Sequence, residues 1–439
     1  MARRKRPLPA EPVEAFIDSL SHDGRGVARV EGKVVFVDGA LPGERVMFRY
    51  TRRRRKNDEG RVTEILEPSP ERVSPRCQWF ERCGGCTLQH LDPEAQIRLK
   101  QQTLVEQLRR IGGVEAAGIL PPLTGPRWGY RHKARLGVRY VKAKGRVLVG
   151  FREKHSGFIV DMDRCEVLHP SVGERIREIA DLIHSLQARE RIPQIEVAVG
   201  DDVAALVFRH LDPLTEGDRD ALRRFGERSE LHIYLQPAGP DSVSPLWPEE
   251  SQLLYRLPDF DLEFRFLPTD FTQVNSELNR MMVSRAVSLL DPRPDELLLD
   301  LFCGIGNFTL PLARRAAEVI GVEGEPGLVQ RAKENAARNG LDNVTFQVAD
   351  LTESADTGWE GRRFHKILLD PPRSGALEVL PRLAAFDAAR ILYVSCNPAT
   401  LARDAGELVN RYGYRLISAG VMDMFPHTAH VESIAVFER

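Results

Sequence analysis

Cys396 is the side chain of this sequence best placed to act as a nucleophile. It follows the apolar run 391–394 and precedes a proline that opens a helical pattern. A strand ending here would bring the thiol to the carboxyl edge of an α/β sheet, where such sheets bind their ligands. A cysteine within a strand is commonly an inert packing residue, but a thiolate at this edge can attack a substrate. We therefore predict covalent catalysis by Cys396.

Two further residues bear on this chemistry. Glu432 lies in the sequence His-Val-Glu-Ser at residues 430–433, at the start of the final strand-like run. A carboxylate there can accept a proton, although an exposed glutamate at a strand start gives the same pattern. Cys303 lies inside a glycine loop, where we expect it to pack beneath a ligand and not to react.

The other four cysteines have the spacing of a metal site. Cys77, Cys83 and Cys86 form the pattern C-x5-C-x2-C, and Cys165 lies far downstream. Residues 1–12 lack the apolar segment of a secretory signal, so we expect a cytoplasmic protein whose thiols stay reduced. Four thiolates suit either a structural zinc ion or a [4Fe–4S] cluster. Zinc sites more often combine two short C-x2-C pairs, so three clustered ligands and one distant ligand favour the iron–sulfur cluster.

The sequence Asp-Leu-Phe-Cys-Gly-Ile-Gly-Asn at residues 300–307 is typical of a ligand-binding loop. Its glycines let the backbone approach a ligand closely at the start of the next helix. Glu323 and Asp350 end the next two predicted strands, where one carboxylate can bind ribose hydroxyls and the other can border an adenine. Dinucleotide dehydrogenases and S-adenosylmethionine-dependent methyltransferases share this layout. The form D-x-x-x-G-x-G, with Asp370-Pro-Pro-Arg on a later strand end, favours the methyltransferases over the G-x-G-x-x-G of dehydrogenases.

An α/β sheet is needed to position these residues, and the pattern of the last third of the chain predicts one. Helical patterns alternate with apolar runs of strand length at residues 297–302, 319–323, 344–349, 366–370 and 391–395. This alternation is typical of a doubly wound sheet, so we expect a Rossmann-like methyltransferase domain at residues 269–439. Residues 69–268 show a mixed α+β pattern around the four cysteines. We expect a central iron–sulfur domain there, with a helix near residues 94–111 that packs on the C-terminal domain.

The remaining segment, residues 1–68, has short alternating stretches between turns that contain glycine and proline. Such stretches predict a small OB-like β-barrel, and they cover residues 13–17, 33–37 and 45–50. Residues 1–66 carry 15 Lys and Arg against 10 Asp and Glu, although the whole chain has a net charge of −1. We expect the five consecutive cations at residues 52–56 to lie in a loop and to contact phosphates, although a solvated loop explains such a run as well.

Five motifs together resemble those of the RNA 5-methyluridine methyltransferases. They are Phe-Thr-Gln-Val-Asn at 271–275, the glycine loop at 300–307, Asp-Pro-Pro-Arg-x-Gly at 370–375, Ser-Cys-Asn-Pro at 395–398 and His-Val-Glu-Ser at 430–433. The N-terminal barrel resembles a TRAM domain, an OB-like module that binds RNA. The cysteine pattern resembles that of the iron–sulfur branch of the family, in which it carries a [4Fe–4S] cluster. The resemblance covers nearly the whole chain.

The resemblance implies methylation of carbon 5 of a uridine in RNA, with S-adenosylmethionine as the methyl donor. Carbon 5 of uracil is too weak a nucleophile by itself, so a thiolate first adds to C6 and turns C4–C5–C6 into an enolate. Cys396 would be that thiolate, and Glu432 would remove the C5 proton. The residues that would line the S-adenosylmethionine and uracil pockets are Gln273, Phe302, Asn307, Glu323, Asp350 and Asp370. The cluster ligands would be Cys77, Cys83, Cys86 and Cys165.

The barrel and the four cysteines together favour 23S ribosomal RNA as the substrate. Family members that act on tRNA would lack both features, and relatives that act on another 23S uridine typically lack the barrel; both substrates stay open as alternatives. An inactive RNA-binding assembly factor would not need both Cys396 and Glu432. A radical enzyme would normally show C-x3-C-x2-C and an open iron, whereas Cys165 can complete the ligand set here. We expect a monomer, and no membrane association, because no apolar run approaches the ~18 residues of a membrane span.

Overall fold

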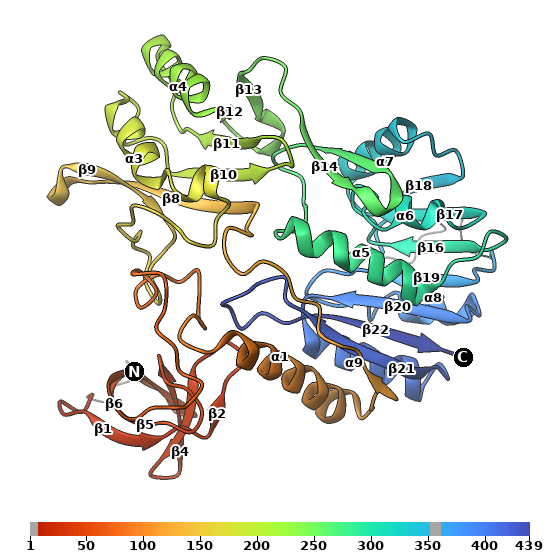
Figure 1. Cartoon of the computed structure of the whole chain (residues 1–439), viewed down its shortest axis with the longest axis horizontal. Helices are drawn as coiled ribbons and strands as arrows, with labels where there is room; N and C mark the ends of the chain where they lie inside the picture. Colours follow the sequence, from red (N-terminus) through yellow and green to blue (C-terminus); the bar gives the residue numbers. More distant parts are fainter. Residues whose placement is uncertain (1–7, 352–360) are drawn as a thin grey trace, which may run out of the picture. The chain divides into compact units, whose positions relative to one another are not determined.

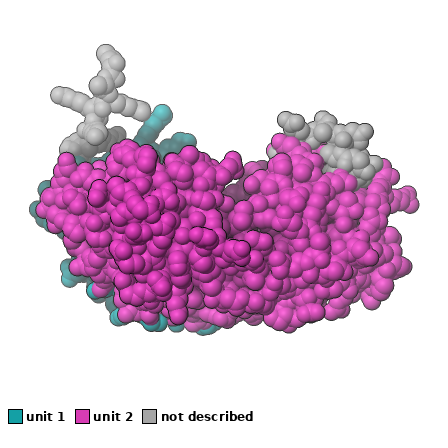
Figure 2. Space-filling view, turned by 90° about the horizontal axis from the view of Figure 1, so that it is seen from above, with its two compact units in different colours: residues 1–100, 152–158, 425–430 teal, residues 101–151, 159–424, 431–439 magenta. Residues whose placement is uncertain are grey.

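The computed structural model describes residues 8–351 and 361–439. The chain divides into two compact units, each formed by segments that are far apart in the sequence (Figure 2). The first unit contains the chain up to Lys100 together with residues 152–158 and 425–430. The second unit contains residues 101–151, 159–424 and 431–439. The division into three domains along the sequence, at 1–68, 69–268 and 269–439, stays a prediction.

Six strands near the N-terminus form one sheet in the order β1-β5-β6-β4-β3-β2 (Figure 1). They are β1 (Val13–Phe16), β2 (Ser19–Leu20), β3 (Gly26–Val30), β4 (Lys33–Asp38), β5 (Arg45–Arg53) and β6 (Asn57–Glu67). Alternate side chains, among them Val35, Val37 and Phe48, are fully buried in the core of this sheet. Gly60 passes beneath the ring of Phe48, where a Cβ atom would come within 2.4 Å of the ring.

The sequence had suggested that the five cations at residues 52–56 lie in a loop, but part of this run lies in a strand. Arg52 and Arg53 are the last residues of β5, because β5 stays paired with β6 as far as Arg53 and Asp58. The buried Asp58 carboxylate is 3.4 Å from Arg53, and Arg54 forms an ion pair with Glu59 at 2.9 Å. Acidic residues of β6 therefore neutralise part of this charge.

Helix α1 (Pro93–Gln107) begins one residue before the helix expected near residues 94–111. It continues into a π-helical turn (Leu108–Gly112) that packs against α9 (Pro398–Asn410). The approach is close, because a Cβ atom at Gly112 would lie 2.3 Å from the carbonyl oxygen of Ala402. The turn after α1 thus supports the helix that follows the predicted nucleophile.

A second six-stranded sheet has the order β13-β12-β11-β10-β8-β9. Its strands are β8 (Lys133–Val141), β9 (Arg146–Gly150), β10 (Gln194–Val199), β11 (Ala204–Arg209), β12 (Leu231–Gln236) and β13 (Ser244–Trp247). Strands β11 and β12 pair in parallel, and the other four strand pairs of this sheet are antiparallel. The helices of this part are α2 (Pro170–Gly173), α3 (Ile176–Ser185) and α4 (Glu216–Ser229). A hairpin of β14 (Leu253–Leu257) and β15 (Leu262–Phe266) follows, and short 3-10 turns lie at Lys142–Lys144, Pro240–Ser242 and Pro258–Phe260.

The third sheet has eight strands in the order β18-β17-β16-β19-β20-β22-β21-β7 (Figure 1). They are β7 (Gly118–Ile119), β16 (Leu297–Leu301), β17 (Glu318–Glu323), β18 (Val344–Val348), β19 (Lys366–Leu369), β20 (Arg390–Ser395), β21 (Arg415–Met422) and β22 (Glu432–Glu438). Strands β16 to β20 are parallel, as the alternating pattern predicts, and β22 is antiparallel to both of its neighbours. Its helices are α5 (Ser276–Leu290), α6 (Thr309–Ala313), α7 (Pro326–Arg338), α8 (Leu380–Ala385) and α9. Over the described ranges, no helix has both the length and the apolar character needed to cross a membrane.

Candidate active site

The glycine loop leaves β16 in a tight turn that brings backbone close to the sheet edge. Phe302, Gly304 and Gly306 have φ angles of 65°, 56° and 93°, values that glycine adopts without strain and that are unusual for phenylalanine. The amides of Phe302 and Cys303 donate to the Val322 carbonyl oxygen at 2.9 and 3.1 Å, which ties the loop to β17. The loop is therefore held in one conformation beside the end of the second strand.

Glu323 ends β17 and is fixed by three backbone amides. Its Oε2 accepts from the amide of Gly304 at 3.1 Å, and its Oε1 accepts from Gly324 at 2.7 Å and Glu325 at 3.1 Å. The carboxylate stays half-exposed, and its remaining lone pairs can accept hydrogen bonds from ribose hydroxyls. Asp350 follows β18 and is exposed, so the two carboxylates stand at successive strand ends as the sequence predicts.

Asn307 belongs to a network of polar side chains that the sequence did not predict. Its Oδ1 accepts from the Tyr255 hydroxyl and from Nδ2 of Asn279, and its Nδ2 donates to Oδ1 of Asn279, each at 3.0 Å. Tyr255 and Asn279 also line a narrow cavity together with Gln273 and Ser276. The structure thus brings Gln273 and Asn307 to the same place. Tyr255 comes from the β14–β15 hairpin, where no motif marked it.

Asp300 and Cys303 are buried residues of the glycine loop. Asp300 is fully buried and accepts from the Thr309 hydroxyl at 2.6 Å; burial raises the pKa of this carboxyl to about 8. Cys303 is 4% exposed, and burial raises the pKa of its thiol well above the usual range. A buried thiol that resists ionisation is a poor nucleophile, so the structure agrees with a packing role for Cys303.

Cys396 and Glu432 are brought together by the pairing of β20 with β22. The antiparallel register pairs Ser395 with Ser433, so the next positions along each strand place Cys396 opposite Glu432. The Ser433 hydroxyl donates to the Ser395 carbonyl oxygen at 3.2 Å and holds this register at its end. Asn397 caps α9, with its side chain accepting from the amide two residues on, and it directs the chain away immediately after the thiol.

The surroundings of Cys396 raise the pKa values of its thiol and of two nearby carboxyl groups, so all three groups tend to hold their protons. Burial, followed by the carboxyl groups of Glu432 and Asp370, raises the pKa of Cys396 to about 11. Glu432 is 4% exposed, and burial and Asp370 raise its pKa well above the ordinary value. Burial raises the pKa of Asp370 to about 7. Arg373 lowers the pKa of both Cys396 and Glu432, so it favours the ionised forms that catalysis needs.

The loop that carries Asp370 and Arg373 is anchored to α9. The Arg373 carbonyl oxygen accepts from Nδ2 of Asn397 at 3.0 Å. The buried Asp404 accepts from the Ala376 amide and from the Tyr393 hydroxyl, both at 2.7 Å. Asp404, which lies on α9, therefore ties the loop at Ala376 to β20 at Tyr393. Arg373 was visible in the Asp-Pro-Pro-Arg motif, whereas nothing in the sequence marked Asp404.

Of the four cysteines outside this site, Cys83 and Cys86 are buried, and Cys77 and Cys165 are partly exposed. The loop that carries three of them is ordered by its own backbone: Cys83 donates its amide to Trp79 at 2.7 Å, and the Gly85 amide donates to the Cys83 sulfur at 3.4 Å. Within residues 8–351 and 361–439, no group of three or more His, Cys, Asp or Glu side chains is arranged to hold a metal ion. The metal site therefore stays a prediction.

Comparison with known proteins places this site in context. A family model described as tRNA (Uracil-5-)-methyltransferase matches residues 249–439, and the TRAM domain model matches residues 11–62. The protein named 23S rRNA (uracil(1939)-C(5))-methyltransferase RlmD from Methylococcus capsulatus is 59% identical over 438 residues, which cover 99% of this chain and 99% of that protein. The protein of the same name from Alkalilimnicola ehrlichii is 58% identical, over 100% of this chain and 99% of that protein.

One solved structure covers nearly the whole fold. It is Pyrococcus abyssi tRNA (uracil-54, C5)-methyltransferase in complex with S-adenosyl-L-homocysteine, with a TM-score of 0.74 and 25% identity over 97% of this chain and 100% of that one. The motifs, the fold and the similarity over the full length agree, and this chain belongs to the RlmD family of 23S rRNA (uracil-C(5))-methyltransferases.

Proposed function

We propose that this chain transfers a methyl group from S-adenosylmethionine to C5 of uridine 1939 of 23S rRNA, the nucleotide in the names of its relatives. The observation that carries the proposal is the antiparallel register that sets Cys396 opposite Glu432 at the edge of the glycine-loop sheet. Mapping 5-methyluridine in ribosomal RNA from cells with and without the gene tests it. Loss of the modification at another 23S uridine, or in tRNA, would support one of the alternatives instead.

In this proposal the chain's residues act in sequence on the uracil ring. Cys396 loses its proton, and its sulfur adds to C6 while the C5–C6 electron pair moves toward O4 as an enolate. S-adenosylmethionine supplies an electrophilic methyl group to the C5 carbon that this addition activates. Glu432 then takes the C5 proton, the C5–C6 double bond returns, and Cys396 leaves as the thiolate. The methyl group gained and the proton lost at C5 balance, and Cys396 returns to the thiolate form in which it attacked C6.

We infer the binding residues from the resemblance to the family. The S-adenosylmethionine and uracil pockets would be lined by Gln273, Phe302, Asn307, Glu323, Asp350 and Asp370. Glu323 supplies a preformed acceptor for hydroxyl groups, since three amides already fix its orientation. Asp370 interacts electrostatically with both Asp300 and Cys396, because its charge raises the pKa values of both groups.

Activity should rise with pH across the neutral and alkaline range. The thiolate is the reactive form, and a pKa of about 11 for Cys396 leaves it mostly protonated at neutral pH. Arg373→Gln removes the positive charge that lowers the pKa values of Cys396 and Glu432. We expect kcat/KM to fall about 10-fold at pH 7.5, with the whole pH profile displaced to higher pH.

Arg373→Lys is the matched control, because it keeps the charge and should keep most of the profile. The measurement is kcat/KM against pH for the three proteins on the same RNA. An equal loss at every pH would mean that Arg373 positions the substrate and does not set the ionisation of Cys396.

The four remaining cysteines are proposed to hold a [4Fe–4S] cluster, with Cys77, Cys83, Cys86 and Cys165 as ligands. The donor set suits it, because four cysteine thiolates are the usual ligands of such clusters. The amide that donates to the Cys83 sulfur is a further favourable feature, since hydrogen bonds to sulfur tune these clusters. No catalytic step is assigned to the cluster.

Protein purified without oxygen should be brown and contain about four irons and four sulfides per chain. Cys83→Ser should lose both the colour and much of the solubility, because the cluster would join distant parts of the chain. Cys303→Ser, at a buried thiol outside the set, should keep the iron and serves as the control. One zinc ion per chain without sulfide would contradict the assignment.

The substrate would be bound as folded RNA by a monomer, with the TRAM domain as the RNA-binding module. The target base must leave its stack to reach Cys396, which costs roughly a few kcal/mol and favours loop nucleotides.

A further inference from the structure

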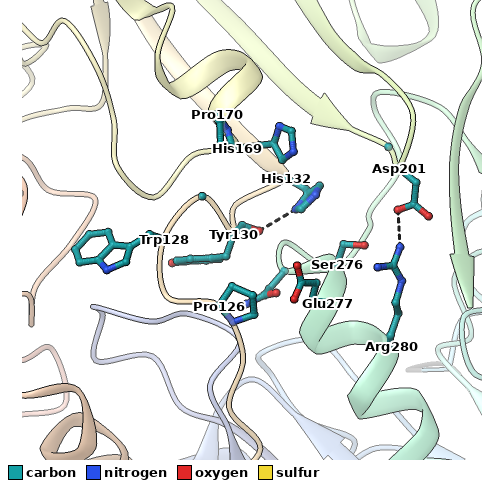
Figure 3. A pocket seen from close by; sticks show the side chains of 13 residues that line it. Pro126, Trp128, Tyr130, His132, His169, Pro170, Asp201, Ser276, Glu277 and Arg280 are labelled. Atoms are coloured by element: carbon teal, nitrogen blue, oxygen red, sulfur yellow. Dashed lines mark hydrogen bonds and ion pairs between the residues drawn. The ribbon is translucent and has the colours of Figure 1, made fainter.

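A cavity of about 350 Å³ lies beside the proposed cofactor pocket and takes no part in the chemistry above. Trp128 and Tyr130 reach it from the segment before β8, and His132 and His169 lie near each other at its other side (Figure 3). The first turn of α5 forms its floor. His132 also lines the narrow cavity that contains Gln273. The cavity is therefore a neighbour of the narrow cavity that contains Gln273 and is of a size that holds small ligands.

The walls of the cavity are fixed by interactions made before any ligand binds. Arg280 on α5 forms an ion pair with Asp201 at 2.8 Å (Figure 3) and donates to the carbonyl oxygen of Arg256 at 3.0 Å. Asp201 also accepts from the Arg256 amide at 2.8 Å. Gly200 approaches the carbonyl oxygen of Leu254 so closely that a Cβ atom would lie 2.6 Å from it. These contacts lock the end of β10 to α5.

The two histidines present one hydrogen-bond acceptor and one donor. Nδ1 of His132 is 2.8 Å from the Tyr130 carbonyl oxygen, so this nitrogen carries the proton and Nε2 is an acceptor. Nδ1 of His169 accepts from the amide of Ser171, so its Nε2 carries the proton and is a donor. Burial lowers the pKa of both rings, which keeps them neutral at physiological pH. Their centroids are 5.0 Å apart.

Asn275 adds a donor that has no partner. It is 1% exposed, and its Oδ1 caps α5 by accepting from the Leu278 amide at 3.1 Å. Its Nδ2 makes no hydrogen bond within the described part of the chain. A buried amide group without a partner costs about 1–3 kcal/mol, so a ligand acceptor at this position would remove a penalty that the free protein carries.

The charge of the cavity disfavours a phosphate group. Asp201 and Glu277 both line it, and Arg280, which lines it too, is already paired with Asp201. A phosphate offers acceptors only, whereas the neutral histidines offer both an acceptor and a donor. Flat aromatic walls with donors and acceptors at the edge match an unstacked nucleobase, which RNA-binding proteins hold by stacking and by contacts to its edge.

We propose that this cavity binds a second nucleobase of the RNA, close in sequence to the target uridine, between its aromatic walls and the polar edge formed by His132, His169 and Asn275. The inference rests on the proposed function, because the base must belong to the RNA that presents uridine to Cys396. It makes the cavity a specificity site: the correct neighbouring base stabilises the complex without contacting the reacting atoms.

The test combines protein variants with RNA fragments that lack one base. Trp128→Ala should raise the KM for an RNA fragment containing the target uridine about 10-fold, with the KM for S-adenosylmethionine unchanged. Asn275→Ser keeps a capping oxygen and removes the Nδ2 amide group, so it should raise the KM for RNA in the same direction while the melting temperature is kept. Each fragment lacks the base at one position that flanks the target uridine. At the position whose base enters the cavity, loss of that base should lower kcat/KM about 10-fold for the wild type. The same loss should lower kcat/KM less than about twofold for Trp128→Ala, because that variant has already lost the contact.

Tyr140→Ala is the matched control, because Tyr140 on β8 stacks on His184 of α3 with centroids 6.2 Å apart and does not line the cavity. It should leave the KM for RNA unchanged. An unchanged KM for Trp128→Ala, or equal losses at every abasic position in both proteins, would overturn the proposal. If the wild type does not methylate the fragment or full-length 23S rRNA, the proposed function fails instead, so the two failures are distinguishable.

Discussion

Cys396→Ala should have no measurable methyltransferase activity on 23S rRNA. Without the sulfur no bond to C6 forms, and C5 of uracil stays too weak a nucleophile to accept the methyl group. We expect kcat to fall on the order of 10⁴-fold or more. The affinity for S-adenosylmethionine should change little, because the residues proposed to bind it lie mainly on other strand ends. Transfer of labelled methyl groups and calorimetric binding of the cofactor measure the two quantities separately.

Cys303→Ala is the control for this loss. Cys303 is buried, and the pKa of its thiol is raised well above the usual range, so the variant should still form a covalent complex with RNA. A denaturing gel shows the complex as a band above the free protein. If Cys396→Ala keeps that band and Cys303→Ala loses it, the nucleophile has been assigned to the wrong cysteine.

Glu432→Gln should stop the reaction one step later. The amide cannot accept the C5 proton, so addition of Cys396 and methyl transfer proceed while elimination stalls. The variant should accumulate a protein–RNA complex that resists denaturation and already carries the labelled methyl group. Turnover should fall about 10²- to 10⁴-fold, the usual effect of losing a general base.

The melting temperature of Glu432→Gln should not fall. Folding raises the pKa of this buried carboxyl, so the ionised form is disfavoured in the native state and its stability cost grows as the pH rises above the unfolded pKa. Glutamine removes that cost. Glu438→Gln, at the other end of β22 and paired with Arg390 at 2.5 Å, should turn over normally. Normal turnover of Glu432→Gln would mean that another base removes the proton.

Much of the local structure was readable from the sequence. The five parallel strands of the third sheet, β16 to β20, lie where the apolar runs do. Local signals suffice there because parallel strands buried on both faces are continuous apolar runs. The end of β5 was misplaced, because ladder pairing with β6 extends the strand past its apolar residues into Arg52 and Arg53.

The proposed catalytic pair, in contrast, could not be recognised as a pair without the tertiary structure. From the sequence alone, Glu432 fitted equally an exposed residue at a strand start; only the insertion of antiparallel β22 between β20 and β21 buries it and sets it opposite Cys396. The same holds for Tyr255 and Asn279, which reach Asn307 from the β14–β15 hairpin and from α5. Residue type and spacing determine what a side chain can do and which local element carries it. Strand order and the dielectric of the folded interior decide which side chains meet and how strongly they hold their protons, because both depend on contacts between distant parts of the chain.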